Sequence, residues 1–493
     1  MERTTIRSLD TTMSDEVQSS SQRYWALALF AICAFAYLPA WQSFFVKDDI
    51  ILTTSAQLDL LATLQHSWPG GFFRPAAELL FAAQYMVFGL HPFPYHLVSF
   101  IAHMGSAYLA YGLFYQLPRF RPVALLAAAI FALHPLNTET VSWISGQMSL
   151  FACLCILASI NLSGRARNRH RTTFIPFLVL GLGFYESSLI GVLLWFAFCL
   201  HDEQFRHSLR PVPILLIGAC LTAYLYWRFF VLDLSSGNYQ TIFALKTCLL
   251  NAVYYLYLLA GGSAIGARIL HYQPDLISTR FLDVFTPLFI VNTLLILTYG
   301  LHHLRRRQWP GFDTLIPFAW LAITLLPTLF LFERPRRLSY LAVPGFSLAI
   351  SQIWYYLQEK ARPGAMIART GLALYIIVLT STLYMRNYDW QEAGDLERNI
   401  PKAIVSDCRT MVFDMPNLVG DALFFNSLST AKWLSLNEVT PVPTLYTTTD
   451  IAWNHNIAKP GCYYLFVDGT ISLAAEIKPQ PTFSRGSNWV YTH

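Results

Sequence analysis

Two adjacent carboxylates, Asp48 and Asp49, stand at the end of the first long apolar run, in FVKDDI. Neighbouring carboxylates repel each other, and removing them from water is costly. A pair kept at this position is explained by a bound cation, by a cationic neighbour, or by a substrate proton that one carboxylate accepts. A loop start solvated by water is the plainer alternative, and the rest of the chain decides between them.

A lone carboxylate, Glu186, lies between two apolar runs in GFYESSLIG and has no basic residue close to it in sequence. An ionisable side chain in an apolar stretch is costly and therefore points to a functional site. Other polar side chains border apolar runs in the same way and are candidates for a shared site. They are Lys47, Arg74, His91, His96, His103, His134, Asn137 and Glu139.

Composition indicates that membrane-spanning helices hold these residues. The chain has 493 residues, of which 55% are hydrophobic and only 13% are charged, whereas a soluble domain carries about 25% charged residues. The net charge of +5 is too small to suggest a nucleic-acid partner. The polar stretch 1–23 lacks the pattern of a cleaved signal peptide, so we expect Tyr24 to Val46 to be retained as the first spanning helix.

Apolar runs long enough to span a membrane recur between residues 24 and 385. They predict about eleven transmembrane helices, centred near residues 35, 105, 130, 152, 180, 194, 221, 292, 322, 347 and 375. Basic residues follow every even-numbered run, which makes those loops cytoplasmic. They include Arg119 and Arg121, Arg165 to Arg171, Arg206 and Arg210, Arg305 to Arg307, and Lys360 and Arg362. The N-terminal tail is then cytoplasmic, and the carboxylate pair faces the opposite side.

The outer side of this arrangement receives two long loops, 47–93 and 233–283. Both loops contain apolar stretches that we expect to lie in the membrane interface. Counting Pro75 to Leu90 as a spanning helix would invert every later basic cluster, which is why it is placed in the interface.

Segment 386–493 is polar and mixed in pattern, and we expect it to form a small extracytoplasmic α/β domain. Its strand-like and helical runs are Thr410 to Phe413, Phe424 to Leu436 and Cys462 to Val467. Its two cysteines, Cys408 and Cys462, lie beside strand-like runs on the side of the membrane where disulfides persist, so a bridge between them is one expectation. Two buried thiols that do not meet are the alternative.

Three arginines interrupt the charge pattern, because Arg334, Arg336 and Arg337 follow the ninth apolar run on the outer side. Membrane proteins carry an excess of Lys and Arg in their cytoplasmic loops, so three arginines on the outer side run against this rule. Side chains that extend from a helix end to the interface would explain it. The functional alternative is that these arginines bind an anion, most simply a phosphate.

Together these motifs resemble the GT-C superfamily of membrane glycosyltransferases, and most closely its O-mannosyltransferase-like branch, whose relatives carry tetratricopeptide repeats. The matching segments keep the family's order and spacing over about residues 40–350. They are KDD in the first outer loop, FRPAAELLFAAQYMVFGLHPFPYHLVSFIAH, AIFALHPLNTETVSWISGQMSLFA, YESSLIG and RRLSYLAVPGF. The repeats are absent here, and FDMPNLVGDALFF is similar to the short α/β domain of some bacterial relatives.

The resemblance implies a lipid-phosphate-linked sugar donor and a loop acid as catalytic base, a role that falls on Asp48 or Asp49. The family's HP-x-x-T-E element is matched here, which makes Glu139 a further catalytic candidate. The matching residues are His134, Pro135, Thr138 and Glu139.

The chain departs from the family pattern at two charged positions. The Lys-Glu pair after the fifth run is Tyr185-Glu186 here, so the glutamate is kept and the lysine is lost. The Glu-Arg pair ahead of Tyr340 is Arg336-Arg337 here. A base in place of an acid is expected to change how the donor phosphate is held.

The implied reaction is physically coherent. An acceptor hydroxyl loses its proton as it attacks the anomeric carbon, and a carboxylate within hydrogen-bond reach accepts that proton. The departing lipid phosphate gains charge in the transition state, which arginines stabilise. The candidates for this contact are Arg74, Arg334, Arg336 and Arg337, with Lys47, His103, His134, Glu186 and Tyr340 in support.

We therefore expect a polytopic α-helical enzyme of the inner membrane, surrounded by membrane lipids. It would use a polyprenyl-phosphate-sugar donor and an extracytoplasmic protein or glycolipid acceptor, with no nucleic acid and no cofactor. A divalent metal between Asp48, Asp49 and nearby histidines is chemically feasible but not required. A transporter of lipid-linked saccharide and a degenerate, non-catalytic scaffold are the alternatives. Polar residues gathered at one face, without a visible repeat, favour the enzyme.

Overall fold

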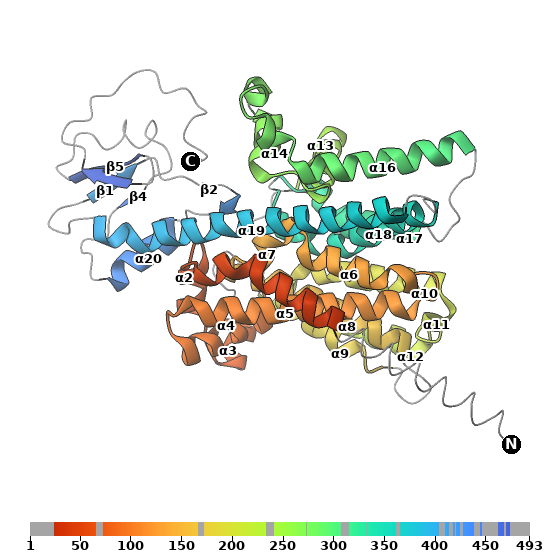
Figure 1. Cartoon of the computed structure of the whole chain (residues 1–493). Helices are drawn as coiled ribbons and strands as arrows, with labels where there is room; N and C mark the ends of the chain where they lie inside the picture. Colours follow the sequence, from red (N-terminus) through yellow and green to blue (C-terminus); the bar gives the residue numbers. More distant parts are fainter. Residues whose placement is uncertain are drawn as a thin grey trace, which may run out of the picture.

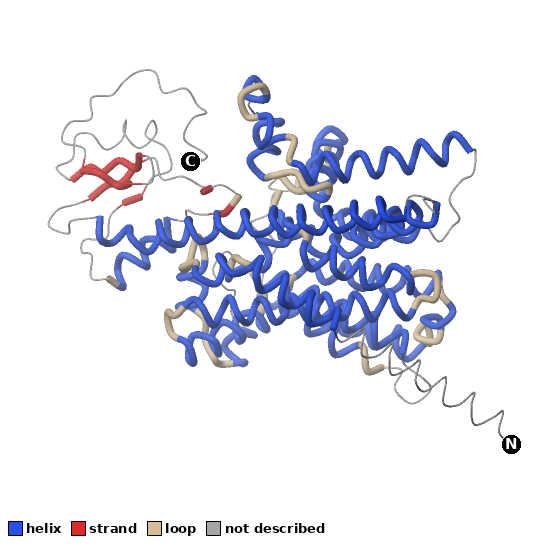
Figure 2. The backbone as a smooth tube through the Cα atoms, in the orientation of Figure 1, coloured by secondary structure: helices blue, strands red, loops and turns tan. Residues whose placement is uncertain are grey.

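The computed structural model is almost entirely helical, with one small region of strands (Figures 1 and 2). The structure describes residues 24–65, 72–165, 172–232, 241–272, 274–306, 315–332, 334–360, 365–403, 410–413, 418–419, 421–423, 427–437, 444–445, 462–467 and 470–473. Each of the eleven predicted apolar centres falls inside a helix. These helices are Tyr24–Gln42, α5 (Pro92–Gln116), α6 (Ala124–Leu133), α8 (Gln147–Arg165), α9 (Ile175–Phe184), α10 (Leu189–His201), α12 (Pro211–Tyr226), α16 (Pro287–Arg306), α17 (Ile316–Leu325), α18 (Val343–Lys360) and α19 (Ala365–Ala403).

By length and composition, five helices of the described part could each cross a membrane. They are Tyr24–Gln42, Pro92–Gln116, Ile144–Arg165, Pro211–Val231 and Pro287–Arg305. A sixth candidate is the pair Arg121–Leu133 and Pro135–Val141, which is bent by 45°. Four shorter apolar helices accompany them, so several spans are present but the predicted number of eleven is not established.

Short helices occupy the two predicted outer loops. The first loop holds α2 (Asp49–Ser55), α3 (Leu60–Gln65) and α4 (Pro75–Phe88), and the second holds α13 (Leu245–Leu259), α14 (Ala264–Tyr272) and α15 (Phe281–Val284). Helix α4 begins at a proline, whose missing N–H is harmless in the first helical turn. It ends at Gly89, whose φ of +55° is a conformation that glycine adopts without strain.

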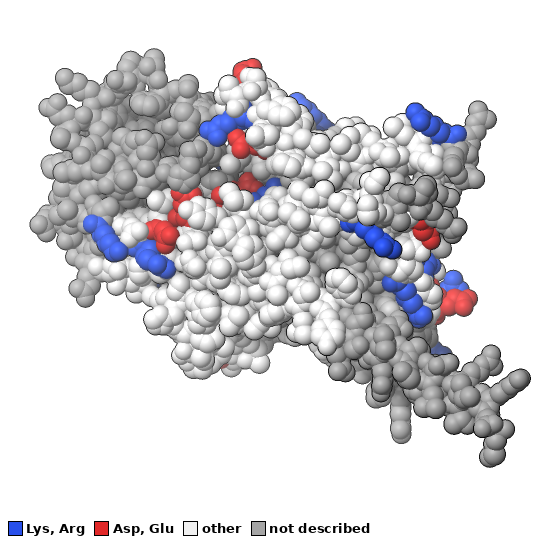
Figure 3. Space-filling model, in the orientation of Figure 1, with Lys and Arg blue, Asp and Glu red and all other residues white. Residues whose placement is uncertain are grey.

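The helices run between two ends of the bundle, and the loops that follow α5 and α10 lie together at one of them. Arg119, after α5, pairs with Asp202, after α10, at 3.5 Å. The C-terminal end of α16 lies toward the same end, whereas α2 lies at the opposite end (Figure 1). Between the ends, a broad stretch of helix surface carries neither Lys, Arg, Asp nor Glu (Figure 3). This charge distribution suits a bundle whose middle lies in lipid.

Helix α6 lies at the centre of the bundle and packs against α5 and α18. Its sequence ALLAAAIFAL places small buried side chains, including Ala124, Ala127 and Ala128, at these contacts. Small side chains let helix backbones approach closely in membrane proteins. The tight centre fixes the polar segment that follows α6.

Helix α19 connects the bundle to the C-terminal segment without a break, so the expected domain border at residues 385 and 386 lies inside it. Its outer half rests on the end of the first helix. The hydroxyl of Ser43 donates to the carbonyl of Trp390 at 2.6 Å. A methyl group at Gly394 would collide with the backbone nitrogen of Phe44, so only glycine permits this approach.

The strands belong to the C-terminal segment (Figure 2). A four-stranded sheet has the order β4-β1-β5-β6, in which β1 pairs parallel with β4 and β5, and β5 pairs antiparallel with β6. A separate hairpin joins β2 to β3. The bounds are β1 Thr410–Phe413, β2 Leu418–Val419, β3 Ala422–Leu423, β4 Thr444–Leu445, β5 Cys462–Val467 and β6 Thr470–Leu473, with helix α20 at Ser427–Leu436.

The two predicted strands have the expected bounds, and α20 covers Ser427–Leu436 of the predicted helix, whose first three residues lie outside the described part. Thr410 is the register partner of Cys462. Cys408 lies outside the described residues, so the proposed disulfide stays a prediction.

Candidate active site

The carboxylate of Asp49 is buried and ties the first turn of α2 to η3 (Ile144–Gly146). One of its oxygens accepts a hydrogen bond from the backbone N–H of Val46 at 3.0 Å. The other accepts from the N–H and the hydroxyl of Ser145 at 2.8 and 2.5 Å. Burial raises the pKa of Asp49 to about 7, although the hydrogen bond from Ser145 opposes the increase.

Asp48 and Lys47 precede α2 on the more accessible side of the same turn. Asp48 is partly exposed and is the N-cap of the helix. Lys47 has a φ of +51° and is the only non-glycine residue of the described part with a positive φ. Such backbone strain, worth about 1–3 kcal/mol, is found at functional sites. The two adjacent acids are thus in different environments, because Asp49 is buried and Asp48 is partly exposed.

Glu139 is buried between two of the arginines that the sequence singled out. Its carboxylate accepts from the Nε of Arg336 at 2.7 Å, and from the side chain and the backbone N–H of Arg337 at 3.4 and 3.3 Å. Little of these side chains is exposed, namely 3% of Glu139, 6% of Arg336 and 17% of Arg337. One carboxylate thus contacts two guanidinium groups.

Residues 135–146 form a bridging segment between the acid pair and these arginines. It consists of η2 (Pro135–Asn137), α7 (Thr138–Val141) and η3. The indole N–H of Trp143 donates to the carbonyl of Val46 at 3.3 Å, and the same ring lies 5.1 Å from the guanidinium of Arg337. A side chain at Gly146 would lie 2.5 Å from the carbonyl of Glu139, so the tight turn requires glycine.

Arg334 lies beside this cluster but has a different partner. Its Nε donates to the side-chain oxygen of Asn251 at 2.6 Å, and its guanidinium lies 5.5 Å from the ring of Tyr254. It makes no ion pair within the described part of the chain. Arg334 therefore adds a third guanidinium group to this part of the chain.

Arg74 and Glu186 belong together in a second cluster. The Nε and a terminal nitrogen of Arg74 lie 3.0 and 2.9 Å from one carboxylate oxygen of Glu186. The other oxygen accepts from Arg228 at 3.1 Å. The guanidinium of Arg74 also lies 4.1 Å from the ring of Tyr185, which stands where the family has a lysine. The partners of Glu186 are thus two arginines that lie far from it in the sequence.

The predicted histidines hold the architecture together. His103 contacts the hydroxyl of Tyr340 at 2.6 Å and the carbonyl of Ala132 at 2.9 Å, which ties α5 to η9 (Arg336–Ala342). His134 accepts from the N–H of Leu136 at 3.2 Å, so its other ring nitrogen donates to the carbonyl of Leu259 at 2.9 Å. Both imidazoles are buried with both nitrogens engaged, which suits positioning rather than proton transfer.

Four charged residues at the site were missed by the sequence analysis, namely Arg228, Arg386, Glu397 and Asp421. Arg228 lies inside an apolar run, and that position was a usable signal. The other three lie in polar sequence where charge is common, so no local pattern separates them from surface residues. Glu397 is buried beneath α20, where it accepts from the hydroxyl of Thr430 at 2.8 Å.

Helix α20 covers the first loop at this place. The ring of Trp433 lies 4.9 Å from that of Phe44, and the N–H of Ile51 donates to Ser429 at 3.4 Å. The described residues contain no cluster of three or more His, Cys, Asp or Glu residues placed to hold a metal ion.

Comparison with known proteins supports the resemblance seen in the motifs. Over 128 residues the chain is 31% identical to "Protein O-mannosyl-transferase Tmtc1" of Drosophila melanogaster, over 25% of this chain and 15% of that protein. Over 86 residues it is 34% identical to human "Protein O-mannosyl-transferase TMTC1", over 17% and 10%. Over 177 residues it is 27% identical to Drosophila Tmtc3, over 29% and 18%. The matches thus span less than a fifth of these curated relatives.

No family model matches the chain. Among solved structures, ArnT from Cupriavidus metallidurans in the apo state aligns with a TM-score of 0.44 and 10% identity over 90% of this chain and 93% of that chain. ArnT bound to undecaprenyl phosphate aligns with a TM-score of 0.41 and 11% identity. These scores are too low to establish a shared fold. The sequence matches confirm the predicted resemblance to GT-C membrane glycosyltransferases of the O-mannosyltransferase branch, and the apolar helices make this a multi-pass membrane protein.

Proposed function

We propose that the chain is a membrane glycosyltransferase that moves a sugar from a polyprenyl-phosphate-linked donor to a hydroxyl outside the cytoplasm. The observation that carries the proposal is the bridging segment. It contacts Asp49, the neighbour of Asp48, through Ser145, and the arginine pair through Glu139. A base and an anion-binding group joined by one short segment are what transfer from a lipid phosphate requires. The similarity to proteins named O-mannosyl-transferases supports the same reaction class.

Asp48 is the proposed catalytic base. A base must present an oxygen to the acceptor hydroxyl within about 2.6–3.2 Å. Burial raises the pKa of Asp49 to about 7, but the same burial keeps its carboxylate away from an incoming acceptor. Asp49 would therefore orient the turn, while the partly exposed Asp48 receives the proton.

Arg336 and Arg337 are the proposed partners of the donor phosphate, with Arg334 alongside. Arg336 and Arg337 contact Glu139, and Arg334 contacts the amide of Asn251, so three guanidinium groups lie in one short segment. Arginine suits phosphate because its planar guanidinium donates two parallel hydrogen bonds. Arg74 pairs with Glu186 instead, so its predicted phosphate contact becomes the weaker proposal.

The proposed orientation places the N-terminus in the cytoplasm and the site on the outer side of the inner membrane. The acceptor is proposed to be a protein hydroxyl or an envelope glycolipid, and no metal is needed for a base and arginines to act. A transporter of lipid-linked saccharide would have no use for a base at the site.

The proposal is tested by mass spectrometry of envelope glycolipids and surface proteins from a strain that lacks the chain. We expect one class of molecules to lose a sugar and to regain it when the wild-type gene is restored. Asp48→Asn should not restore it, whereas Asp49→Asn should restore it in part. Full restoration by both variants would rule out a carboxylate base in this loop.

A further inference from the structure

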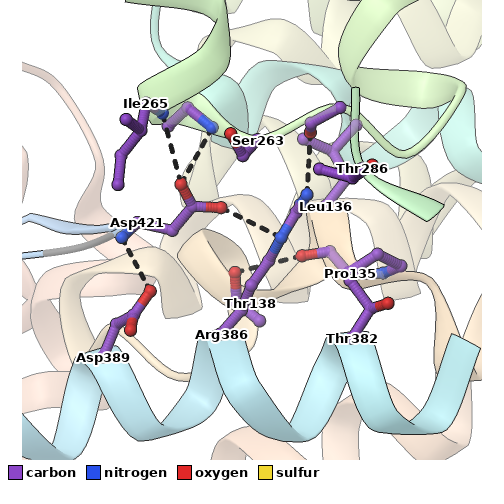
Figure 4. A network of polar contacts seen from close by, with 12 residues as sticks. Pro135, Leu136, Thr138, Ser263, Ile265, Thr286, Thr382, Arg386, Asp389 and Asp421 are labelled. Atoms are coloured by element: carbon purple, nitrogen blue, oxygen red, sulfur yellow. Dashed lines mark hydrogen bonds and ion pairs between the residues drawn. The ribbon is translucent and has the colours of Figure 1, made fainter. Parts of the chain in front are cut away.

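Asp421 lies in the turn between β2 and β3, far along the chain from the proposed site, yet it is buried. Its side chain joins two elements of the bundle, as Figure 4 shows. One carboxylate oxygen accepts from the backbone N–H groups of Ala264 and Ile265 at 2.9 and 3.4 Å. The other lies 2.9 Å from the Nε of Arg386 on α19. Asp421 therefore caps the start of α14 and pairs with α19 at once.

The partners of Asp421 are themselves fixed. The guanidinium of Arg386 also donates to the carbonyls of Gly261 and Gly262 at 3.0 and 2.8 Å. The backbone N–H of Asp421 donates to the carboxylate of Asp389 at 2.8 Å (Figure 4). The turn thus has a partner for its side chain and for its N–H, and its position is set by α14 and α19.

The backbone carbonyl of Asp421 reaches the proposed site. It accepts from a terminal nitrogen of Arg336 at 2.5 Å, while the Nε of the same arginine donates to Glu139. Arg336 is thereby held from two sides, by an acid of the bridging segment and by the C-terminal hairpin. Because a guanidinium is planar, two fixed contacts determine its orientation, and they also determine the direction of its remaining N–H groups.

We infer that Asp421 is a positioning residue for the anion-binding arginine, so that the C-terminal hairpin is a structural part of the site rather than an attachment to it. This inference rests on the proposed function for the identity of the anion, a polyprenyl phosphate. The hairpin sets the direction of Arg336, and through it the fit of the phosphate. A guanidinium that has lost one contact must be reordered by its ligand, and that cost weakens binding.

The test compares purified full-length variants for binding of undecaprenyl phosphate in detergent, and for hydrogen exchange of the backbone amides of 336–342. Asp421→Asn removes the charge that faces Arg386. Asp389→Ala removes the acceptor of the Asp421 N–H and affects only a half-buried residue, so it keeps the test available if the first variant misfolds. Asp395→Asn is the control, because Asp395 lies on the same helix with a half-exposed side chain and pairs only with Arg398 among the described residues.

We expect both network variants to bind the phosphate about tenfold more weakly, the size of one lost hydrogen bond to a charged group, and the control to match the wild type. The amides of 336–342 should exchange faster in the same two variants. Unchanged binding in both, whatever happens to exchange, would reduce Asp421 to a structural residue and overturn the inference. If the wild type itself fails to bind undecaprenyl phosphate, the proposed donor is wrong. Exchange at 336–342 then decides alone whether Asp421 holds Arg336, and unchanged protection would refute it.

Discussion

Replacing Glu397 by glutamine should make the stability of the protein less sensitive to pH. Burial raises the pKa of Glu397 from 4.5 to about 8, the hydrogen bond from Thr430 opposes this, and the charge of Asp49 adds to the increase. Between pH 4.5 and about 8, the Glu397 carboxyl is ionised in the unfolded chain but protonated in the folded protein. The free energy of unfolding therefore falls as the pH rises from about 4.5 to about 8, and then levels off.

The size of the effect follows from the shift. Each pKa unit corresponds to about 1.4 kcal/mol, so Glu397 costs the wild type up to about 5 kcal/mol by pH 8 relative to pH 4.5. Glutamine keeps the shape and the acceptor for Thr430 without a proton to lose. Burial also raises the pKa of Asp49 to about 7, so the stability of the Glu397→Gln variant should still depend on pH to some extent. A protein of this size should show a difference of a few degrees in Tm.

The assay is thermal unfolding in detergent, followed by tryptophan fluorescence between pH 5 and pH 9. The two proteins should have similar Tm values near pH 5, and Glu397→Gln should have a higher Tm than the wild type at pH 9. Asp395→Asn, on the exposed side of the same helix, serves as the control. Parallel curves for wild type and Glu397→Gln would refute the reasoning, because they would mean that the buried carboxyl keeps an ordinary pKa.

Three further predictions concern packing and covalent structure. Glu186→Gln removes the carboxylate that faces Arg74 and Arg228, and it should lower the free energy of unfolding by about 2 kcal/mol, because the pair is only partly buried. Adding Arg228→Gln to this variant should restore part of the lost stability. An unchanged Tm in Glu186→Gln would contradict the prediction. Gly394→Ala should lower the free energy of unfolding by roughly 3 kcal/mol, because the new methyl group would collide with the backbone at Phe44. Gly218→Ala is the control and should be neutral, because Gly218 has open space around it. Equal Tm values for the two variants would contradict this reasoning. A Cys408–Cys462 disulfide should appear as a linked peptide in mass spectrometry of non-reduced protein, with about 2–4 kcal/mol of stabilisation, and two alkylated thiols would exclude it.

The eleven predicted helices could be located from the sequence because each contains an apolar run, and lipid leaves no other way to satisfy a spanning backbone. The strands Thr410–Phe413 and Cys462–Val467 were readable for a similar reason, since β-branched and aromatic residues cluster there. The number of spans could not be fixed. Helices such as α9 and α17 are short, and their length alone does not decide whether they cross a membrane.

The residues proposed for the site, apart from Arg228, Arg386, Glu397 and Asp421, could be named from the sequence, but their pairing could not. Glu139 and Arg336 lie 197 positions apart, and Arg74 and Glu186 lie 112 apart. No local pattern couples such distant residues. Each charge was noticed because it was costly where it stood, but its partner depended on how the helices pack. The contribution of the C-terminal hairpin to Arg336 was invisible for the same reason, since it is made by a backbone carbonyl.

The most direct test of the central claim is sugar transfer by the purified protein. Membranes of a strain lacking the chain would supply acceptors, and a polyprenyl phosphate carrying a radiolabelled sugar would be the donor. We expect the wild type to move label into the acceptor fraction and to release polyprenyl phosphate, and Asp48→Asn to do neither while remaining folded. No transfer from any polyprenyl-phosphate sugar, or transfer undiminished in Asp48→Asn, would contradict the account.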